Sequence, residues 1–439
     1  MAQKTFNWDQ CLQHAAISDV GMRRANNQDS YAEMLAGNVE SWYERGHVFL
    51  VADGMGAHAA GELASRLAAE GVPHLYYKHR ELAPPEAIHR AIQETNTHIH
   101  RRGQANAELY NMGTTTSVLL LLPQGVLVAH VGDSRVYRLR GEQLQQLTFD
   151  HSLVWELQAS GQLTDNGEAP PGIPKNVITR SLGPHPAVQV DLEGPFPVQV
   201  DDVFLLCTDG LTGKVEDREL GPLLSSLPPD EAVQVLVDLA NLRGGPDNIT
   251  VIVAKVIGAE ITTRVSQAEP LTVGGDLQLE RRVHPALWIV AGVCLLASVG
   301  MMIAQQPVPA LLAVLGAVVA GAVGVLQKFG AGNAGVSLTA GRRLGHGPHR
   351  RCECPVNRAA VDHLRATILD LSTSRLGEEP WSHGGHDFSE CLRRAEQLAH
   401  RKDYAPAIRQ CGQAVRLLME EVRQRRGRKT SDSSLDFLS

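Results

Sequence analysis

The stretch HVFLVADG, residues 47–54, is an apolar run of the kind that forms a buried strand, and it ends in an aspartate, Asp53. Three further apolar runs each lie next to an aspartate where the expected strand meets a turn. These aspartates are Asp133 in GVLVAHVGDSR, Asp209 in DVFLLCTDG and Asp247 in GGPDNITVIV. A fifth, Asp29, lies in SDVGMRRANNQDS. Because several buried carboxylates are unfavourable unless cations neutralise them, the pattern predicts a metal site at the edge of a sheet.

Residues 8–258 have the pattern of one continuous folded domain. Its β-rich runs are 48–52, 116–122, 126–131, 135–139, 203–207 and 249–256. Helical stretches lie within 56–77, 84–103 and 228–245, and the last two open with prolines and stop at glycines, as helix boundaries do. Strands outnumber helices, which predicts an α+β fold with helices packed outside stacked sheets.

The net charge of −7 hides a division along the chain. Residues 1–327 hold 22 Lys and Arg against 35 Asp and Glu, a net charge of −13, whereas residues 328–439 hold 19 against 13, a net charge of +6. The two parts are therefore expected to meet different surroundings. The seven cysteines lack the spacing of a disulfide framework, and the N-terminus lacks the apolar core of a signal peptide.

Two uncharged apolar segments, 286–304 and 308–326, follow a polar linker at 259–284. Each has 19 residues, roughly 28 Å as a helix, which is long enough to cross a bilayer. We expect a two-helix transmembrane hairpin over 285–327, with the alternative of a buried hairpin in a soluble domain. Basic residues flank it on both sides, so both chain termini are expected in the cytoplasm. Small residues at every fourth position of the second span favour packing within the hairpin, or dimerisation.

Residues 328–439 are expected to form a basic, mainly helical cytoplasmic tail. The spacing in CLRRAEQLAHRKDYAPAIRQCGQAV resembles one tetratricopeptide helix pair, although such repeats need neighbours to bury a core. His346, His349, Cys352 and Cys354 lie close together in HGPHRRCECP, which leaves zinc as an alternative, but Cys-x-Cys is tighter than the usual zinc spacing. We expect the basic side chains of this tail to face one of three surroundings: anionic lipid, an acidic partner or solvent.

Carboxylate oxygens are hard ligands suited to magnesium or manganese. Two such ions activate a water and polarise a phosphoryl oxygen for in-line attack. Arg24, five residues before Asp29, is a candidate anchor for the substrate anion, and His58, five residues after Asp53, is a candidate proton donor. Each feature alone is weak, since a DG pair is usually a turn and a single histidine usually lies at a surface.

The order of these motifs resembles the type 2C metal-dependent serine/threonine protein phosphatases in their bacterial form. The resemblance rests on SDVGMRRANNQD, LVADGMGAHAAGELAS, MGTTTS, AHVGDSRVYRLR, LTFDHS, ITRSLG, FLLCTDGL and GGPDNITVIV, and it covers residues 12–257. It implies a four-layer α-β-β-α fold, a β-sandwich flanked by helix pairs. It also implies two core Mn²⁺ or Mg²⁺ ions, with a weaker third, at one end of the sandwich.

The same resemblance implies a role for each residue of the site. Asp53 would bridge the two metals, with the Gly54 carbonyl and Asp29 on the second-metal side. Asp209 and Asp247 would hold the first metal, and Asp133 with Asp209 the third. Arg24 would bind the substrate phosphate, His58 would protonate the leaving oxygen, and Asn248 would orient Asp247. Two positions depart from the family pattern, Gln28 and Ala57, and neither removes a ligand.

The sequence therefore predicts hydrolysis of phosphoserine and phosphothreonine in proteins by a phosphatase anchored in the cell membrane and facing the cytoplasm. Its expected partners are phosphoproteins, including a Ser/Thr kinase or the substrates of that kinase, and membrane lipid, but not nucleic acid. Residues 152–180 would form a flap that shapes substrate choice. Two alternatives remain, a regulatory binding module without turnover and a phosphomonoesterase of small molecules.

Overall fold

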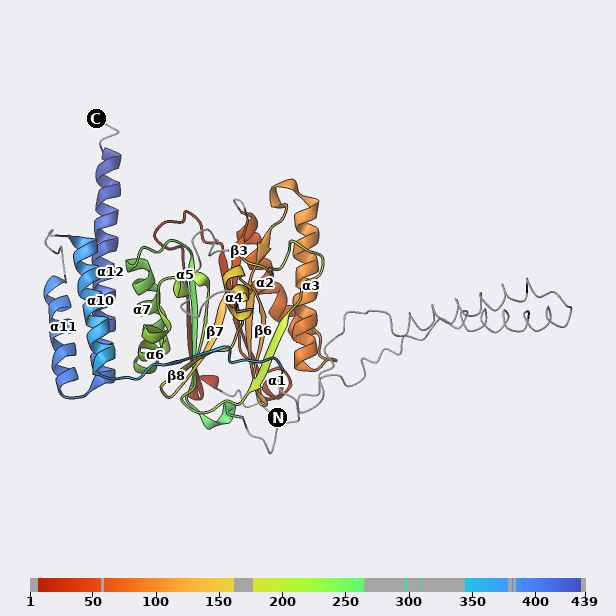
Figure 1. The fold of residues 1–439 in the computed structure, drawn as a ribbon, viewed down its shortest axis with the longest axis horizontal. Coiled ribbons are helices and arrows are strands. Elements are labelled where there is room, and N and C mark those ends of the chain that lie inside the picture. Colours follow the sequence, from red (N-terminus) through yellow and green to blue (C-terminus); the bar gives the residue numbers. More distant parts are fainter. Residues whose placement is uncertain are drawn as a thin grey trace. The chain divides into compact units, whose positions relative to one another are not determined.

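The computed structural model describes residues 7–56, 59–161, 177–263, 344–377, 381 and 384–435, with the single positions 297 and 309; from 427 on it describes the backbone alone. The chain divides into two compact units. One unit combines residues 1–269 with 343–439, and the other is 270–342. The first unit contains nearly all described residues, and the following paragraphs concern it (Figure 1).

Two antiparallel sheets form the centre of this unit. In spatial order, the first sheet is β1 (Leu12–Asp19), β11 (Ile249–Val256), β10 (Val203–Cys207), β7 (Arg135–Arg140), β8 (Gln143–Gln146) and β12 (Arg350–Glu353). The second is β2 (Asp29–Met34), β3 (His47–Met55), β5 (Thr116–Leu122), β6 (Gly125–Val131) and β9 (Asp191–Phe196), with β4 (Gly113–Thr114) beside β3. The predicted strand runs thus correspond to β3, β5, β6, β7, β10 and β11.

Strand β10 shows why its run is apolar throughout. Phe204 and Leu206 belong to the core between the two sheets, whereas Val203, Leu205 and Cys207 belong to the core under the helices. Successive side chains of a strand point to opposite faces, so a strand buried on both faces needs apolar residues at every position. The same requirement explains the apolar runs of the other central strands.

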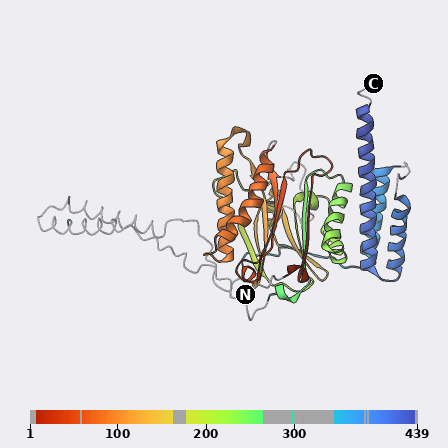
Figure 2. The same ribbon diagram turned by 180° about the vertical axis from the view of Figure 1, so that it is seen from behind.

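A helix pair covers the outer face of each sheet (Figure 1 and Figure 2). Helices α2 (Ala60–Lys78) and α3 (Pro84–Ala105) pack on the second sheet, and α6 (Asp217–Ser226) and α7 (Pro229–Leu242) pack on the first. The predicted α+β class, with helices outside stacked sheets, is confirmed. The short helices are α1 (Val39–Arg45), α4 (Leu153–Ala159) and α5 (Asp209–Thr212), with 3₁₀ turns at Trp8–Gln10, Ala107–Leu109 and Ala259–Ile261.

Three helices of the C-terminal region form a further layer on α6 and α7: α10 (Arg358–Leu376), α11 (Gly385–His400) and α12 (Tyr404–Leu435). The segment with tetratricopeptide-like spacing forms α11 and α12. Their apolar faces extend the core under the first sheet, as Ile368, Phe388 and Met419 show. Arg423 of α12 lies 3.0 Å from Asp238 of α7, and His363 of α10 lies 3.2 Å from Glu219 of α6.

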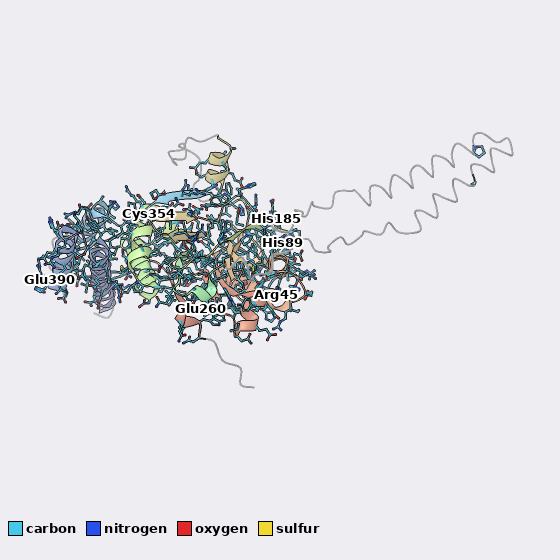
Figure 3. All side chains as sticks on the ribbon, turned by 90° about the horizontal axis from the view of Figure 1, so that it is seen from below. Arg45, His89, His185, Glu260, Cys354 and Glu390 are labelled. Atoms are coloured by element: carbon cyan, nitrogen blue, oxygen red, sulfur yellow. The ribbon has the colours of Figure 1, made fainter. Side chains whose placement is uncertain are left out.

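The C-terminal region first crosses the two sheets as an extended segment, residues 344–354, which we call the strap. The backbone N–H of Gly194 on β9 donates to Leu344 at 3.0 Å, and β12 then pairs with β8. The strap ends at Cys354, which packs against Gly221 of α6 so closely that a Cβ on that glycine would lie 2.2 Å from the cysteine Cβ. Cys354 is labelled in Figure 3. The strap therefore contacts both sheets of the sandwich.

The segments predicted to form a membrane hairpin, 286–304 and 308–326, lie outside the described residues except for Ala297 and Pro309. Most of the expected linker, 264–284, also lies outside them. Among the helices that the structure does describe, none combines the length and the apolar character needed to cross a bilayer.

Candidate active site

Asp29 and Asp53 lie directly opposite each other, because β2 and β3 pair in the register that joins these two residues. Paired residues of neighbouring strands project from the same face, so the two carboxylates point to the same side of the sheet. The end of β3 is held by Thr115, whose hydroxyl accepts a hydrogen bond from the Asp53 N–H at 2.9 Å. Pairing and packing, rather than a flexible loop, therefore place the first two carboxylates.

The other aspartates reach this point from different strand ends. Asp209 opens α5 just after β10, and its charge raises the pKa of Asp53. Asp133 follows β6 after Gly132, whose φ of +115° and close approach to Thr115 exclude a side chain there. Asp247 lies in the turn before β11. The other four aspartates all lie near enough to Asp53 for their charges to raise its pKa.

The cluster contains buried acceptor atoms that have no protein partner within the described residues. These atoms are Asp29 Oδ1, Asp133 Oδ1 and Asp209 Oδ1. A buried acceptor without a hydrogen bond costs about 1–3 kcal/mol, which a bound cation would offset. The donor set consists of carboxylate oxygens, the ligands that Mg²⁺ and Mn²⁺ prefer. The donor chemistry therefore suits hard divalent ions, although among the described residues no three acidic, histidine or cysteine side chains lie close enough together to enclose one.

The electrostatics of the cluster agree with this fit. Burial is the main cause that raises the pKa of Asp29 to about 7 and that of Asp133 to about 8, and the nearby charge of Asp209 contributes to both shifts. Burial, followed by the charge of Asp29, raises the pKa of Asp53 well above its ordinary value. Burial and the charge of Asp247 raise the pKa of Asp209. Without cations, these carboxyls cannot all be ionised at neutral pH.

Arg24 lies beside the cluster, with its Nη2 2.8 Å from Asp247 Oδ2 and about half of its side chain exposed (49%). The loop that carries it is held by Asn248, whose Nδ2 donates to the carbonyls of Val20 and Asn26, each at 3.0 Å. The backbone N–H of Asn248 donates to Asp247 Oδ1 at 2.9 Å. Asn248 therefore positions the arginine loop through its side chain and Asp247 through its backbone.

Gly54 follows Asp53 in a position that accepts no side chain. A Cβ there would lie 2.1 Å from the carbonyl oxygen of Gly61 and 2.5 Å from that of Gln28. His58 and Ala57 lie outside the described residues, so the role of His58 as proton donor stays a prediction. Of the expected flap, 152–161 and 177–180 are described, and 162–176 are not.

Two threonines that the sequence analysis did not single out bind Asp29. The hydroxyls of Thr208 and Thr250 each donate to Asp29 Oδ2 at 2.8 Å. Both hydrogen bonds act against burial and lower the pKa of Asp29. The available signal was the position of Thr208 directly before Asp209 and of Thr250 just inside the following strand run.

Two of the four residues considered for zinc have other partners. His349 Nε2 lies 2.9 Å from Glu193 Oε1, and the thiol of Cys354 donates to the carbonyl of Asp217 at 3.3 Å. His346 is exposed. The interactions of His349 and Cys354 hold the strap in place.

Comparison with known proteins identifies the family to which these motifs belong. The family model described as protein phosphatase 2C matches residues 22–239. The protein phosphatase PhpP of Streptococcus pneumoniae is 36% identical over 247 residues, which are 55% of this chain and 96% of that protein. The chain belongs to the protein phosphatase 2C family. Its described fold and its order of motifs are those expected from the resemblance.

Two solved structures are also similar to this phosphatase. The serine/threonine phosphatase Stp1 from Staphylococcus aureus is 31% identical, with a TM-score of 0.51, and the match covers 59% of this chain and 98% of that one. The catalytic domain of the phosphatase PstP, solved in complex with two manganese ions, is 33% identical, with a TM-score of 0.48 and coverage of 56% and 99%. The family model ends before the strap and the C-terminal helices.

The raised pKa values predict that the metal-free phosphatase loses stability as pH rises. Asp29 and Asp133, with pKa values of about 7 and about 8, bind more protons in the folded chain than in the unfolded one, where carboxyl pKa values are near ~4. The stability present at low pH is therefore lost as pH rises through these values, unless a cation replaces the protons. We expect the midpoint temperature of unfolding in chelator to fall as pH rises from 5.5 to 8.5. The increase in this midpoint on adding Mn²⁺ should grow over the same range.

Scanning fluorimetry of the full-length protein with Mn²⁺ and with chelator measures both trends. The variant Asp29→Asn/Asp133→Asn is the control, because it should flatten the decline in chelator. A midpoint in chelator that is constant or rises over this pH range would contradict the expectation.

The threonine hydrogen bonds predict a contribution to metal affinity. Substituting Thr208→Val and Thr250→Val together removes both donors to Asp29 and keeps the side-chain shape. Because partners of metal ligands typically contribute 10–100-fold to affinity, we expect Mn²⁺ binding to weaken by about tenfold or more in titration calorimetry. The matched control is Thr95→Val, which removes a buried hydroxyl without a hydrogen-bond partner. Equal Mn²⁺ affinity in the double variant and the control would show that the hydroxyls do not support the site.

Proposed function

We propose that this protein is a phosphoprotein phosphatase held at the cytoplasmic face of a membrane, and that it hydrolyses phosphoserine and phosphothreonine with Mn²⁺ or Mg²⁺. The observation that carries the proposal is the convergence of five aspartates from separate strand ends, next to an exposed arginine. Membership of the phosphatase family supports the reaction class. The intact carboxylate set favours catalysis over a regulatory module without turnover.

In this reaction the protein residues bind, orient and hold charge. Asp29, Asp53, Asp209 and Asp247 would hold the core ions, and Asp133 would hold a weaker third with Asp209. Bound ions supply an activated water and neutralise charge on the phosphoryl group. About half of the Arg24 side chain is exposed, so its guanidinium can engage two phosphate oxygens while Asp247 limits its position.

Transfer of a proton to the serine or threonine oxygen is the remaining requirement of the reaction. His58, the residue proposed for this step, follows β3 within a few residues of Asp53. An alkoxide is a poor leaving group, so a positioned acid contributes about 10²–10⁴-fold to such a step.

The decisive measurement is phosphate release from a phosphothreonine peptide by the full-length protein in detergent. We expect turnover with Mn²⁺, none with chelator, and a loss of at least about 100-fold in Asp209→Asn, because removing one ligand charge weakens the ion site. The control is Asp370→Asn, an equal change of charge at an exposed position of α10. Turnover that survives both chelator and Asp209→Asn would refute the metal-dependent mechanism. Faster hydrolysis of sugar phosphates than of the peptide would favour the small-molecule alternative.

Membrane attachment is proposed from the sequence of residues 285–327. Two uncharged spans are separated by the short polar turn QQP, and Arg281 and Arg282 precede the first span. This pattern is typical of a hairpin with both ends on the cytoplasmic side. The anchor would confine the phosphatase to the membrane surface, and a Ser/Thr kinase or its substrates located there are the proposed partners.

Fractionation after lysis without detergent tests the anchor. We expect the full-length protein in the membrane pellet, resistant to high salt, and released by detergent. Substituting Leu295→Arg and Val318→Arg places a charge near the centre of each span, which costs roughly 2.5–3.5 kcal/mol per residue and should shift the protein to the soluble fraction. Leu295→Phe/Val318→Leu is the matched control and should stay in the pellet. Wild-type protein in the soluble fraction would refute the hairpin.

A further inference from the structure

A cavity of about 320 Å³ opens beside the carboxylate cluster, between the catalytic sheet and the start of the flap. Asp133 and Asp209 line it on the side of the proposed metal ions, and Trp155 of α4 lines it on the side of the flap. The strap contributes one residue, Arg350 of β12. A segment outside the matched family region therefore supplies a side chain next to the reaction centre.

The two arginines of this cavity both lie over the ring of Trp155, but they differ in their hydrogen bonds. The guanidinium of Arg135 lies 2.7 Å from Asp150 Oδ2 and donates to Tyr137 Oη at 2.9 Å, so its hydrogen-bonding capacity is largely used within the protein. Arg350 is exposed and has no ion pair among the described residues. Its guanidinium lies over the ring of Trp155, 4.5 Å from the centroid. A ring face restrains an arginine and leaves its N–H groups available to an anion.

The strap holds Arg350 firmly at this place. In the pairing of β12 with β8, Arg350 lies opposite Gln146, and the neighbouring His349 N–H donates to the Gln146 carbonyl at 2.9 Å. The side chain of His349 bonds to Glu193, which also accepts from the backbone N–H of Gly347 at 2.8 Å. These contacts on both sheets fix the backbone on the N-terminal side of Arg350.

The charges around the cavity indicate what Arg350 can bind. Arg135 neutralises Asp150. Asp133 and Asp209 belong to the proposed ion site, where divalent cations would neutralise them. The charge of Arg350 also lowers the pKa of Asp150, but that carboxylate forms its ion pair with Arg135. The two arginines therefore leave one positive charge in excess, at the edge of the site where a substrate peptide would extend from its phosphorylated residue.

We propose that Arg350 is a substrate-recognition residue that binds an anionic side chain flanking the phosphorylated residue of the protein substrate. This inference rests on the proposed phosphatase function and deepens it by naming a substrate class. The ligand chemistry is a planar carboxylate or a phosphate oxygen pair, which a guanidinium binds in two-pronged fashion. The phosphatase would therefore prefer acidic or multiply phosphorylated sequences.

The test compares phosphothreonine peptides that differ only near the phosphothreonine. One peptide has alanine on both sides, a set has glutamate at one or two positions on either side, and another set has phosphoserine there. For the wild-type protein with Mn²⁺ we expect kcat/KM about tenfold higher on an acidic peptide than on the alanine peptide. In Arg350→Glu this ratio should fall to one or below, mainly through KM, and Arg350→Lys should retain part of it.

The matched control is Arg351→Glu, the same change of charge at the next position of β12, where alternation directs the side chain to the opposite face. It should keep the wild-type ratio. If both variants lose the preference for acidic peptides equally, the effect depends on net charge alone, which would contradict the proposal. A wild-type kcat/KM ratio of one on every peptide would also overturn it. If only phosphoserine peptides are preferred, the ligand is a second phosphate, and if glutamate peptides are preferred as well, a carboxylate suffices.

Two further measurements separate recognition from turnover and from folding. Anisotropy of labelled peptides should rank binding in the same order as KM, with the same loss in Arg350→Glu. Wild-type protein that binds acidic peptides selectively but releases no phosphate would count against the proposed function and not against recognition. Thermal midpoints report folding, and if Arg350→Glu is unstable, Arg350→Gln replaces it and should lose the same preference.

Discussion

Repulsion among carboxylates is the constraint around which the catalytic end of this protein is organised. Asp29 and Asp53 are held opposite each other by strand pairing, and Asp209 lies near enough to Asp53 for its charge to raise the pKa of Asp53. Such proximity raises pKa values and destabilises the folded chain unless cations are bound. The two sheets, packed through an apolar core, hold the strand ends together against this repulsion. The site is therefore assembled at the expense of local stability, which bound ions restore.

The part of the fold that depends on burial was predictable from the sequence. β3, β5, β6, β10 and β11 are buried on both faces, so their runs are apolar and visible. β1 and β2 are half-buried and carry mixed residues, which gives no such run. β12, with the sequence RRCE, has no apolar signal, because backbone pairing with β8 determines its place.

The candidate site shows the same distinction. Four of its five aspartates were predictable because each adjoins an apolar run, whereas Asp29 lies in the polar stretch SDVGMRRANNQDS. Thr208 and Thr250 were not, since a threonine hydroxyl gains its role only from the position of Asp29, which is distant in sequence. Arg350 was even less predictable from the sequence. Its contact with Trp155 depends on the strap, which joins the sandwich from far along the chain. Contacts of this kind follow from tertiary packing rather than from local pattern.

The charge division of the chain also acquires a structural meaning. Arg423 pairs with Asp238, and Arg409 lies 3.6 Å from Glu231, so part of the basic C-terminal region faces acidic helices of the same protein. Exposed ion pairs contribute little free energy individually, about 0–1 kcal/mol. The shared apolar core, which includes Leu236 of α7 and Leu418 of α12, provides the larger part of this attachment.

The late position of β12 in the chain has a consequence for biosynthesis. The ribosome completes β8 and α7 long before residues 350–353 and α12 emerge, so the edge of β8 and the outer face of α7 stay uncovered during translation. An open strand edge and an apolar helix face are sites of aggregation. The nascent chain therefore exposes both surfaces until the C-terminal helices close over it. A chain released early, near residue 258, would retain both liabilities.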